Sequence, residues 1–173
     1  MNHATIVAIV MTKNRTDSLW YSIPEFGDVE FTRPVLAHLK KYQQKCKWSR
    51  EAGGQLFWQY ASEGHKRVAV ITGPRSTDKR TRTSYKADHV KEQIEIDEYY
   101  EKGYFLLGDW HTHPESIASP SSEDRKAIRD IYRSSVNPGP GFVLLIVGTR
   151  PLHESLSVSW CNDNITAVER LNK

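Results

Sequence analysis

The amino-acid sequence predicts a single α/β (α+β) domain over residues 1–173. Its 173 residues are the length of one domain and can bury about two-thirds of the surface of the unfolded chain. Apolar runs rich in β-branched and aromatic residues alternate with segments of helical periodicity. The composition, 38% hydrophobic and 26% charged, is typical of a globular protein and excludes a disordered chain or a membrane protein.

The expected elements follow from local patterns in chain order. Segments 56–61 and 67–73 are expected to form a hairpin, the continuous apolar run 142–147 predicts a central strand, and alternation predicts an outer strand at 152–160. The final segment, 162–173, is expected to form a short helix or to fray. The remaining strands are expected at 6–11 and 19–23, and the main helices at 32–45, 88–102 and 121–135.

Apolar side chains at helical spacing are expected to bury one face of the last two main helices. Tyr99 and Tyr100, near the end of the helix at 88–102, are interpreted as core residues rather than as a contact surface. The set expected to be buried on the helix at 121–135 is Ala127, Ile128, Ile131 and Tyr132.

The most informative stretch is 109–124. His111 and His113 are one residue apart, so both imidazoles point to the same face of an extended strand. Ser121 opens the following helix, and Asp124, three residues later, can turn its carboxylate back toward the histidines. Two histidines and one aspartate leave one position open on a tetrahedral ion, as catalytic zinc sites do.

Each half of this pattern also has a simpler interpretation. An isolated His-x-His is usually a pair of partly exposed strand residues, and Ser-x-x-Asp before an apolar-periodic run is usually a helix cap. The two halves at this spacing are expected by chance in on the order of one such chain in a thousand. Ser121 can also act both as a cap and at a metal site. The combined pattern therefore predicts three-ligand metal chemistry.

The pattern resembles the JAMM signature of the MPN-plus metallopeptidases, a distant Glu followed by His-Ser/Thr-His, seven residues, Ser, two residues and Asp. This sequence matches it without a departure in spacing. The resemblance implies one zinc ion per chain, bound by His111, His113 and Asp124, with Ser121 helping to hold the oxyanion. It also implies a mixed β-sheet flanked by helices, of the cytidine-deaminase-like class, and hydrolysis of peptide or isopeptide bonds at the C-terminus of ubiquitin-like proteins.

The distant Glu is assigned to Glu51, which precedes a double glycine and a strand. The glycines allow close backbone approach or positive φ where that strand begins. Because the resemblance implies the catalytic acid/base in such a context, Glu51 is preferred over Glu30 and Glu63, which lack it. Asp109 and Trp110 precede the histidines directly, and the sequence leaves open whether they orient the ligands or only pack.

Charge is distributed unevenly along the chain. The net charge of +3, with a pI near 8.8, is far from that of a dedicated nucleic-acid binder. Five cations nevertheless fall within twelve residues: Arg75, Lys79, Arg80, Arg82 and Lys86. This stretch is either a solvated loop or, as the resemblance implies for an insertion here, a clamp that binds a substrate tail by strand addition. Arg75, Arg80 and Arg82 are the predicted substrate-binding residues.

Cysteine usage and hydropathy indicate a cytoplasmic protein. Cys46 and Cys161 form no Cys-x-x-Cys pair and are interpreted as free thiols in a reducing compartment. The first apolar run, 6–11, is too short to span a membrane and lacks the flanking features of a signal peptide. No membrane contact is expected.

The run from Gly108 to Pro114 is similar to that of the stand-alone JAMM peptidases of bacterial CBASS anti-phage operons. This likeness implies a functional link to a fused ubiquitin-activating and -conjugating enzyme, which ligates the C-terminus of a CD-NTase to targets, and a role in reversing or restraining that ligation. The alternatives are a JAMM deubiquitinase-like peptidase of another bacterial ubiquitin-like pathway, a nucleic-acid-associated JAMM-like protein and a metal-free MPN scaffold. The retained ligands and Glu51 disfavour the scaffold, and the modest net charge disfavours nucleic acid.

Overall fold

The structure, a computed structural model, describes residues 18–135 and 139–172. Its helices are α1 (Arg33–Tyr42), α2 (His89–Glu101), α3 (Ser122–Ser134) and α4 (Leu152–Ser155). Its strands are β1 (Leu19–Ile23), β2 (Gly27–Phe31), β3 (Gly53–Tyr60), β4 (Lys66–Ile71), β5 (Lys79–Arg80), β6 (Tyr85–Lys86), β7 (Phe105–Thr112), β8 (Phe142–Val147), β9 (Leu156–Cys161), β10 (Ile165–Ala167) and β11 (Arg170–Leu171). The strand expected at 6–11 lies outside the described residues.

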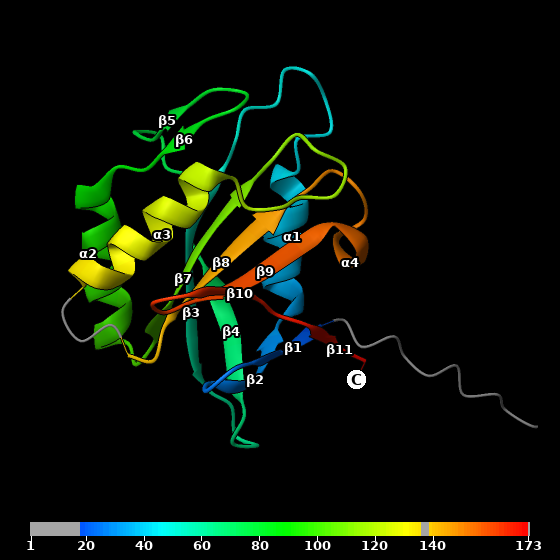
Figure 1. The fold of residues 1–173 in the computed structure, drawn as a ribbon. Helices are drawn as coiled ribbons and strands as arrows, with labels where there is room; N and C mark the ends of the chain where they lie inside the picture. Colours follow the sequence, from blue (N-terminus) through cyan, green and yellow to red (C-terminus); the bar gives the residue numbers. More distant parts are fainter. Residues whose placement is uncertain (1–17, 136–138, 173) are drawn as a thin grey trace, which may run out of the picture.

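Nine of these strands form one curled sheet, in the order β10-β9-β8-β7-β3-β4-β2-β1-β11 (Figure 1). The pairs β7–β8 and β2–β4 are parallel and the other pairs are antiparallel, so the predicted mixed sheet is confirmed. β3 and β4 form the predicted hairpin. β5 and β6 form a separate two-stranded ribbon within the basic stretch.

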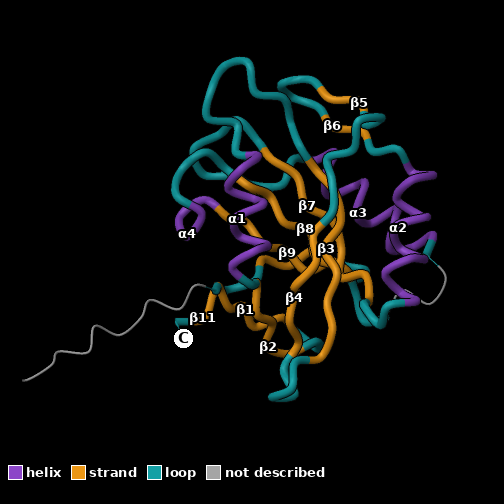
Figure 2. Tube along the Cα trace, turned by 180° about the vertical axis from the view of Figure 1, so that it is seen from behind, coloured by secondary structure: helices purple, strands orange, loops and turns teal. Residues whose placement is uncertain are grey.

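Helices cover both faces of the sheet, with α1 and α4 on one side and α2 and α3 on the other (Figure 2). The core on the α1 side includes Val35 and Leu39, both fully buried. Every residue of β8 is buried, and its side chains alternate between the two cores, so the predicted central strand is confirmed. Val143, Leu145 and Val147 belong to the core on the α1 side, and Phe142, Leu144 and Ile146 to the core on the α3 side.

The faces of α2 and α3 are less buried than the sequence predicted. Ile128 of α3 is 2% exposed, but Ala127 and Ile131 are exposed and Tyr132 is only half-buried. Tyr100 of α2, predicted to be a core residue, is 63% exposed. The reason is the position of the two helices: α2 contacts β3 and β7, whereas α3 contacts β8 and β9. The sheet between them is left open as part of a groove.

The C-terminal segment differs from its prediction. Residues 162–173 were expected to form a helix or to fray, but they contain β10, which pairs with β9, and β11, which pairs with β1. Residues 152–160 contain α4 before β9, and β9 is not an outer strand because β10 lies beyond it. β10 and β11 have three and two residues, too few for a periodic pattern to be recognised.

Two further expectations concern cysteines and membranes. Cys46, which is exposed, and Cys161, which is buried, are both free, so the prediction of unpaired thiols is confirmed. Within the described ranges, no helix combines the length and apolar character that crossing a membrane requires.

Candidate metal centre and active site

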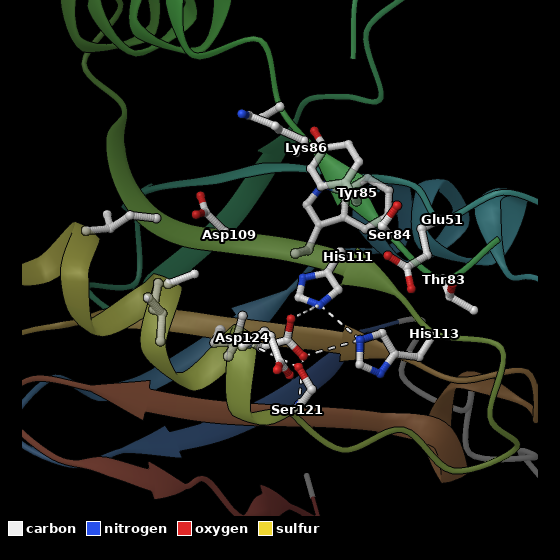
Figure 3. A pocket seen from close by; sticks show the side chains of 18 of the residues that line it. Glu51, Thr83, Ser84, Tyr85, Lys86, Asp109, His111, His113, Ser121 and Asp124 are labelled. Atoms are coloured by element: carbon white, nitrogen blue, oxygen red, sulfur yellow. Dashed lines mark hydrogen bonds and ion pairs between the residues drawn. The ribbon is translucent and has the colours of Figure 1, made fainter. Parts of the chain in front are cut away.

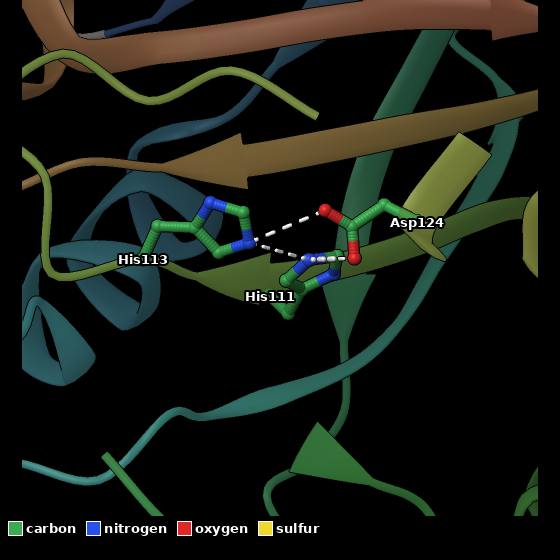
Figure 4. A group of neighbouring side chains, drawn as sticks. All are labelled: His111, His113 and Asp124. Carbon is green, nitrogen blue, oxygen red and sulfur yellow. Dashed lines mark hydrogen bonds and ion pairs between the residues drawn. The ribbon is translucent and has the colours of Figure 1, made fainter. Parts of the chain in front are cut away.

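The three predicted metal ligands converge where β7 ends and α3 begins (Figure 4). His111 Nε2 lies 3.0 Å from Asp124 Oδ1, and His113 Nε2 lies 3.3 Å from Asp124 Oδ2. The two Nε2 atoms are 3.1 Å apart, and the three ligand atoms all lie within 4.8 Å of one another. Ligand atoms about 2.0–2.2 Å from a tetrahedral zinc ion are separated by about 3.3–3.6 Å, so this donor set fits zinc.

Thr112, between the two histidines, fixes them relative to the segment that carries Glu51. Its side chain points to the opposite face of β7 and is fully buried. The Thr112 N–H donates to the Ala52 carbonyl over 2.8 Å, and the Ala52 N–H donates to Thr112 Oγ1 over 3.0 Å. Thr112 Oγ1 in turn donates to Gln44 Oε1 over 3.1 Å. The roles of Thr112 and Gln44 were not predicted from the sequence, although alternation places the middle residue of His-x-His on the other face of the strand.

Asp124 is oriented by the N-terminus of α3. The Ser121 N–H donates to Asp124 Oδ2 over 2.7 Å, and the Asp124 N–H donates to Ser121 Oγ over 3.1 Å, which is a capping box. Although burial opposes the effect, the two imidazoles and Ser121 hold the pKa of the Asp124 carboxyl far below its usual range. The carboxylate is therefore ionised, as a metal ligand must be. The Ser121 side chain, which hydrogen-bonds to the Asp124 carboxyl, also lines the groove.

Glu51, 6% exposed, lies two residues before the first residue of β3 and lines the same groove as His113 (Figure 3). Its carboxylate accepts no hydrogen bond from the described residues, whereas its backbone is firmly held. The Glu51 N–H donates to the Thr81 carbonyl over 2.7 Å, and the Glu51 carbonyl accepts from Arg80 Nε. Burial raises the pKa of the Glu51 carboxyl to about 7, against the attraction of His113. Such a group can accept and release a proton near neutral pH.

The competing carboxylates lie away from this groove. Glu30, on β2, accepts hydrogen bonds from Arg67 and His65. Glu63 lies in the turn between β3 and β4, with a side chain that is 64% exposed. Neither residue lines the groove, and the geometry therefore favours Glu51.

The double glycine, Gly53 and Gly54, lets neighbouring backbone segments approach β3 closely. A Cβ atom on Gly54 would lie 2.1 Å from the Thr72 carbonyl oxygen, and one on Gly53 would lie 2.8 Å from the Trp110 carbonyl oxygen. Neither glycine has a positive φ. The approach lets β3 pair with β7, with Gly53 opposite His111. The start of β3 therefore brings Glu51 beside the ligands.

The three predicted substrate-binding arginines already bond within the chain. The Arg75 side chain is only 6% exposed, so its guanidinium is withdrawn from solvent. The role of the three arginines in substrate binding stays a prediction. The hydrogen bonds run from Arg75 to the carboxylates of Glu92 and Glu95, from Arg80 to the carbonyl of Glu51, and from Arg82 to the carbonyl of Cys46.

A groove of about 610 Å³ contains the ligands and Glu51 and continues between α2, α3 and the β5–β6 ribbon (Figure 3). Asp109 and Trp110, whose roles the sequence left open, lie in different surroundings. Trp110 is 1% exposed and packs in the core, where its Nε1 donates to the Thr72 carbonyl over 3.0 Å. Asp109 lines the groove and is not part of the hydrophobic core, and burial raises the pKa of its carboxyl to about 7.

Comparisons with known proteins agree with this geometry. A family model described as prokaryotic homologs of the JAB domain matches residues 34–161. The chain is 31% identical over 119 residues to a CD-NTase/cGAS isopeptidase of Vibrio cholerae serotype O1, covering 67% of this chain and 73% of that protein. It is 36% identical over 108 residues to a probable metalloprotease, y4qB, of Sinorhizobium fredii, covering 58% and 65%.

A solved structure, the solution structure of protein DSY2949 from Desulfitobacterium hafniense, shares the fold. Its TM-score is 0.51 at 19% identity, and the match covers 80% of this chain and 83% of that one. The family match extends over most of the chain and includes Glu51 and the three predicted metal ligands. The chain therefore belongs to the prokaryotic homologs of the JAB domain, a JAMM/MPN-like family, as its signature predicted.

Proposed function

We propose that this protein is a zinc-dependent metallo-isopeptidase that hydrolyses the amide bond after the C-terminus of a ubiquitin-like or CD-NTase-type protein. The observation that carries the proposal is the convergence of His111, His113 and Asp124 in one groove with Glu51, a buried carboxylate without a hydrogen-bond donor among the described residues. Family membership supports the reaction class. The relative named CD-NTase/cGAS isopeptidase supports the substrate class.

The residues of the groove divide the chemistry between them. One zinc ion per chain, held by the three ligands, would lower the pKa of a bound water to about 7 and polarise the scissile carbonyl. Glu51 accepts the proton of the attacking water and delivers it to the leaving amine, a role worth roughly 10²–10⁴ in rate. The Ser121 hydroxyl donates to the carbonyl oxygen as that oxygen gains negative charge, and losing one such donor commonly costs about 10²–10³ in rate.

The β5–β6 ribbon is placed to hold an extended substrate tail. Residues 83–86, which include β6, line the groove, and β6 pairs with β5 alone among the described strands. Its second edge can therefore hydrogen-bond to an added strand. In this proposal Arg80 and Arg82 support the ribbon, because their guanidinium groups bond to backbone carbonyls of the segment around Glu51.

The proposed setting is a bacterial anti-phage (CBASS) system in the cytoplasm, where the protein removes conjugates made by a fused ubiquitin-activating and -conjugating enzyme. The named Vibrio cholerae relative supports this setting. The Sinorhizobium fredii relative is named only as a probable metalloprotease and its name specifies no pathway, so another bacterial ubiquitin-like pathway is the second candidate. A nucleic-acid role is weakened because the three arginines of the basic stretch are engaged within the chain.

The direct test supplies the purified, zinc-loaded protein with a conjugate made by the ligase of the same operon, a CD-NTase joined through its C-terminus to a lysine. The expected result is release of both partners, measured by intact-mass spectrometry. Glu51→Gln should leave the conjugate intact, which excludes a contaminating protease. An intact conjugate after incubation with the zinc-loaded wild type contradicts the proposed substrate.

A further inference from the structure

The groove continues past the metal ligands to a second, unpaired carboxylate. Asp109 lies two residues before His111 on β7, so both side chains face the groove, about 7 Å apart along the strand (Figure 3). The Asp109 carboxylate accepts no hydrogen bond from the described residues. Glu92 of α2, whose side chain is 14% exposed, lines the same part of the groove. Two acidic side chains from different elements therefore face one space.

Negative charge exceeds positive charge around this space. Arg75 donates to Glu95 over 2.9 Å and to Glu92 over 3.4 Å, and it lies 3.9 Å from Asp78. Asp109 and Glu92 line the same groove. Glu92 also lies 3.0 Å from His89 Nδ1, and Asp78 also accepts hydrogen bonds from Tyr85 and from the Asp88 N–H, so of these carboxylates only Asp109 accepts no hydrogen bond from the described residues. A carboxylate withdrawn from water without a partner is costly, so this arrangement favours the arrival of a further cation.

The opposite wall of the groove is apolar. Ala127, Ile128 and Ile131 of α3 line it, and two of them are exposed to the groove although their spacing predicted burial. Lys86 of β6 is exposed and also lines the groove. An acidic end with an apolar wall matches a side chain that has an aliphatic stem and a cationic head. A free metal ion would make no favourable contact with the apolar side chains of this wall.

We propose that the space bounded by Asp109, Glu92, Ala127 and Ile131, the acidic recess, binds an arginine or lysine side chain of the substrate's C-terminal tail. The inference rests on the proposed function and adds the sequence preference of the substrate. An extended chain advances about 3.3 Å per residue, so this side chain lies about two or three residues before the cleaved bond. Asp109 is then a specificity-determining residue, and a guanidinium can engage its carboxylate with two parallel hydrogen bonds.

The test uses internally quenched peptides that are identical except for one position, two or three residues before the cleaved bond, which holds arginine, lysine, norleucine or glutamate. Zinc-loaded wild type should cleave the arginine and lysine peptides with kcat/KM about tenfold above the norleucine peptide. In Asp109→Asn this ratio should fall to near one, with the norleucine peptide cleaved at close to its wild-type rate. Asp130→Asn, an exposed residue of α3 outside the groove, should keep the wild-type ratio.

Equal cleavage of all peptides by the wild type would overturn the acidic recess and leave the proposed function standing. An equal loss for the arginine and norleucine peptides in Asp109→Asn would also overturn it, because that pattern indicates a structural role. If no peptide is cleaved, the affinities of labelled arginine and norleucine peptides for the Glu51→Gln variant are measured by fluorescence anisotropy. Tighter binding of arginine, lost when Asp109→Asn is added, supports the recess independently of cleavage, and equal or absent binding rejects it.

Discussion

Glu30 and Glu51 are glutamates that the fold largely removes from solvent, and their surroundings are opposite. Glu30 accepts hydrogen bonds from Arg67 over 2.6 Å and from His65 over 3.1 Å, and these partners hold its pKa below the usual range although burial opposes them. Glu51 accepts none from the described residues, and burial raises its pKa to about 7. Only the Glu30 carboxylate is occupied by hydrogen bonds that stabilise the fold.

The two regions also differ in how they fix the carboxylate. The contacts of Glu30 are made by its side chain, so they stabilise the sheet but occupy the oxygens. Glu51 is fixed through its backbone, by Thr81 and Arg80, so its oxygens remain free in the groove. Backbone anchoring thus places a reactive side chain without consuming it, and the comparison predicts which substitutions affect activity and which affect stability.

The largest expected effect comes from removing the acid/base. Glu51→Gln should lower kcat by roughly 10²–10⁴ while zinc content and the unfolding midpoint stay close to wild type, because the side chain holds neither the metal nor the fold. Single-turnover cleavage of the conjugate and metal analysis measure both quantities. Glu63→Gln, at an exposed turn, is the matched control. Unchanged cleavage by Glu51→Gln would remove Glu51 from the mechanism.

A smaller effect is expected from loosening the backbone anchor. Arg80→Ala deletes the guanidinium that bonds to the Glu51 carbonyl, and a hydrogen bond to a charged group is worth about 1.5–3 kcal/mol. We expect kcat to fall about tenfold or more with KM little changed, because Glu51 is mispositioned while the groove stays open. Steady-state kinetics check this.

Arg82→Ala is the control for that variant, since it removes a guanidinium that bonds to the Cys46 carbonyl instead. A raised KM with unchanged kcat in Arg80→Ala would instead assign Arg80 to substrate binding, as the sequence alone predicted.

The smallest effect on activity is expected at Glu30. Glu30→Gln should destabilise the protein by about 1–3 kcal/mol at pH 7 in urea unfolding and leave kcat unchanged. Because the folded pKa of Glu30 lies below its unfolded value of about 4.3, the stabilisation is complete above that value and is lost as pH falls through the folded pKa. The difference between wild type and variant should therefore shrink in acid. A difference independent of pH would show that charge does not carry it.

Local patterns predicted the convergence of His111, His113 and Asp124 because these residues are close in sequence, and strand alternation followed by a helix cap brings them together. Glu51 required the family resemblance, because its place beside the ligands depends on the pairing of β3 with β7, which no local pattern shows. Likewise β8 was predicted from its continuous apolar run, whereas β2 and the short strands β5, β6, β10 and β11 give little periodic signal.

The misassigned surfaces have a common physical cause. Arg75 is expected at the surface because charged side chains usually are, but its partners Glu92 and Glu95 come from a later helix. Helical spacing predicts that Ala127 and Ile131 are buried, but the separation of α2 from α3 leaves them facing the groove. Both features arise from tertiary packing, and both lie at the acidic recess.

The central claim is that the convergent donors hold zinc, and metal analysis of the purified protein tests it most directly. We expect about one zinc per wild-type chain, the same value for His153→Ala, whose half-exposed side chain lies outside the groove, and loss of zinc from a folded His113→Ala. A wild type that takes up no metal after zinc is offered, or a His113→Ala variant that retains it, would contradict this account of the active site.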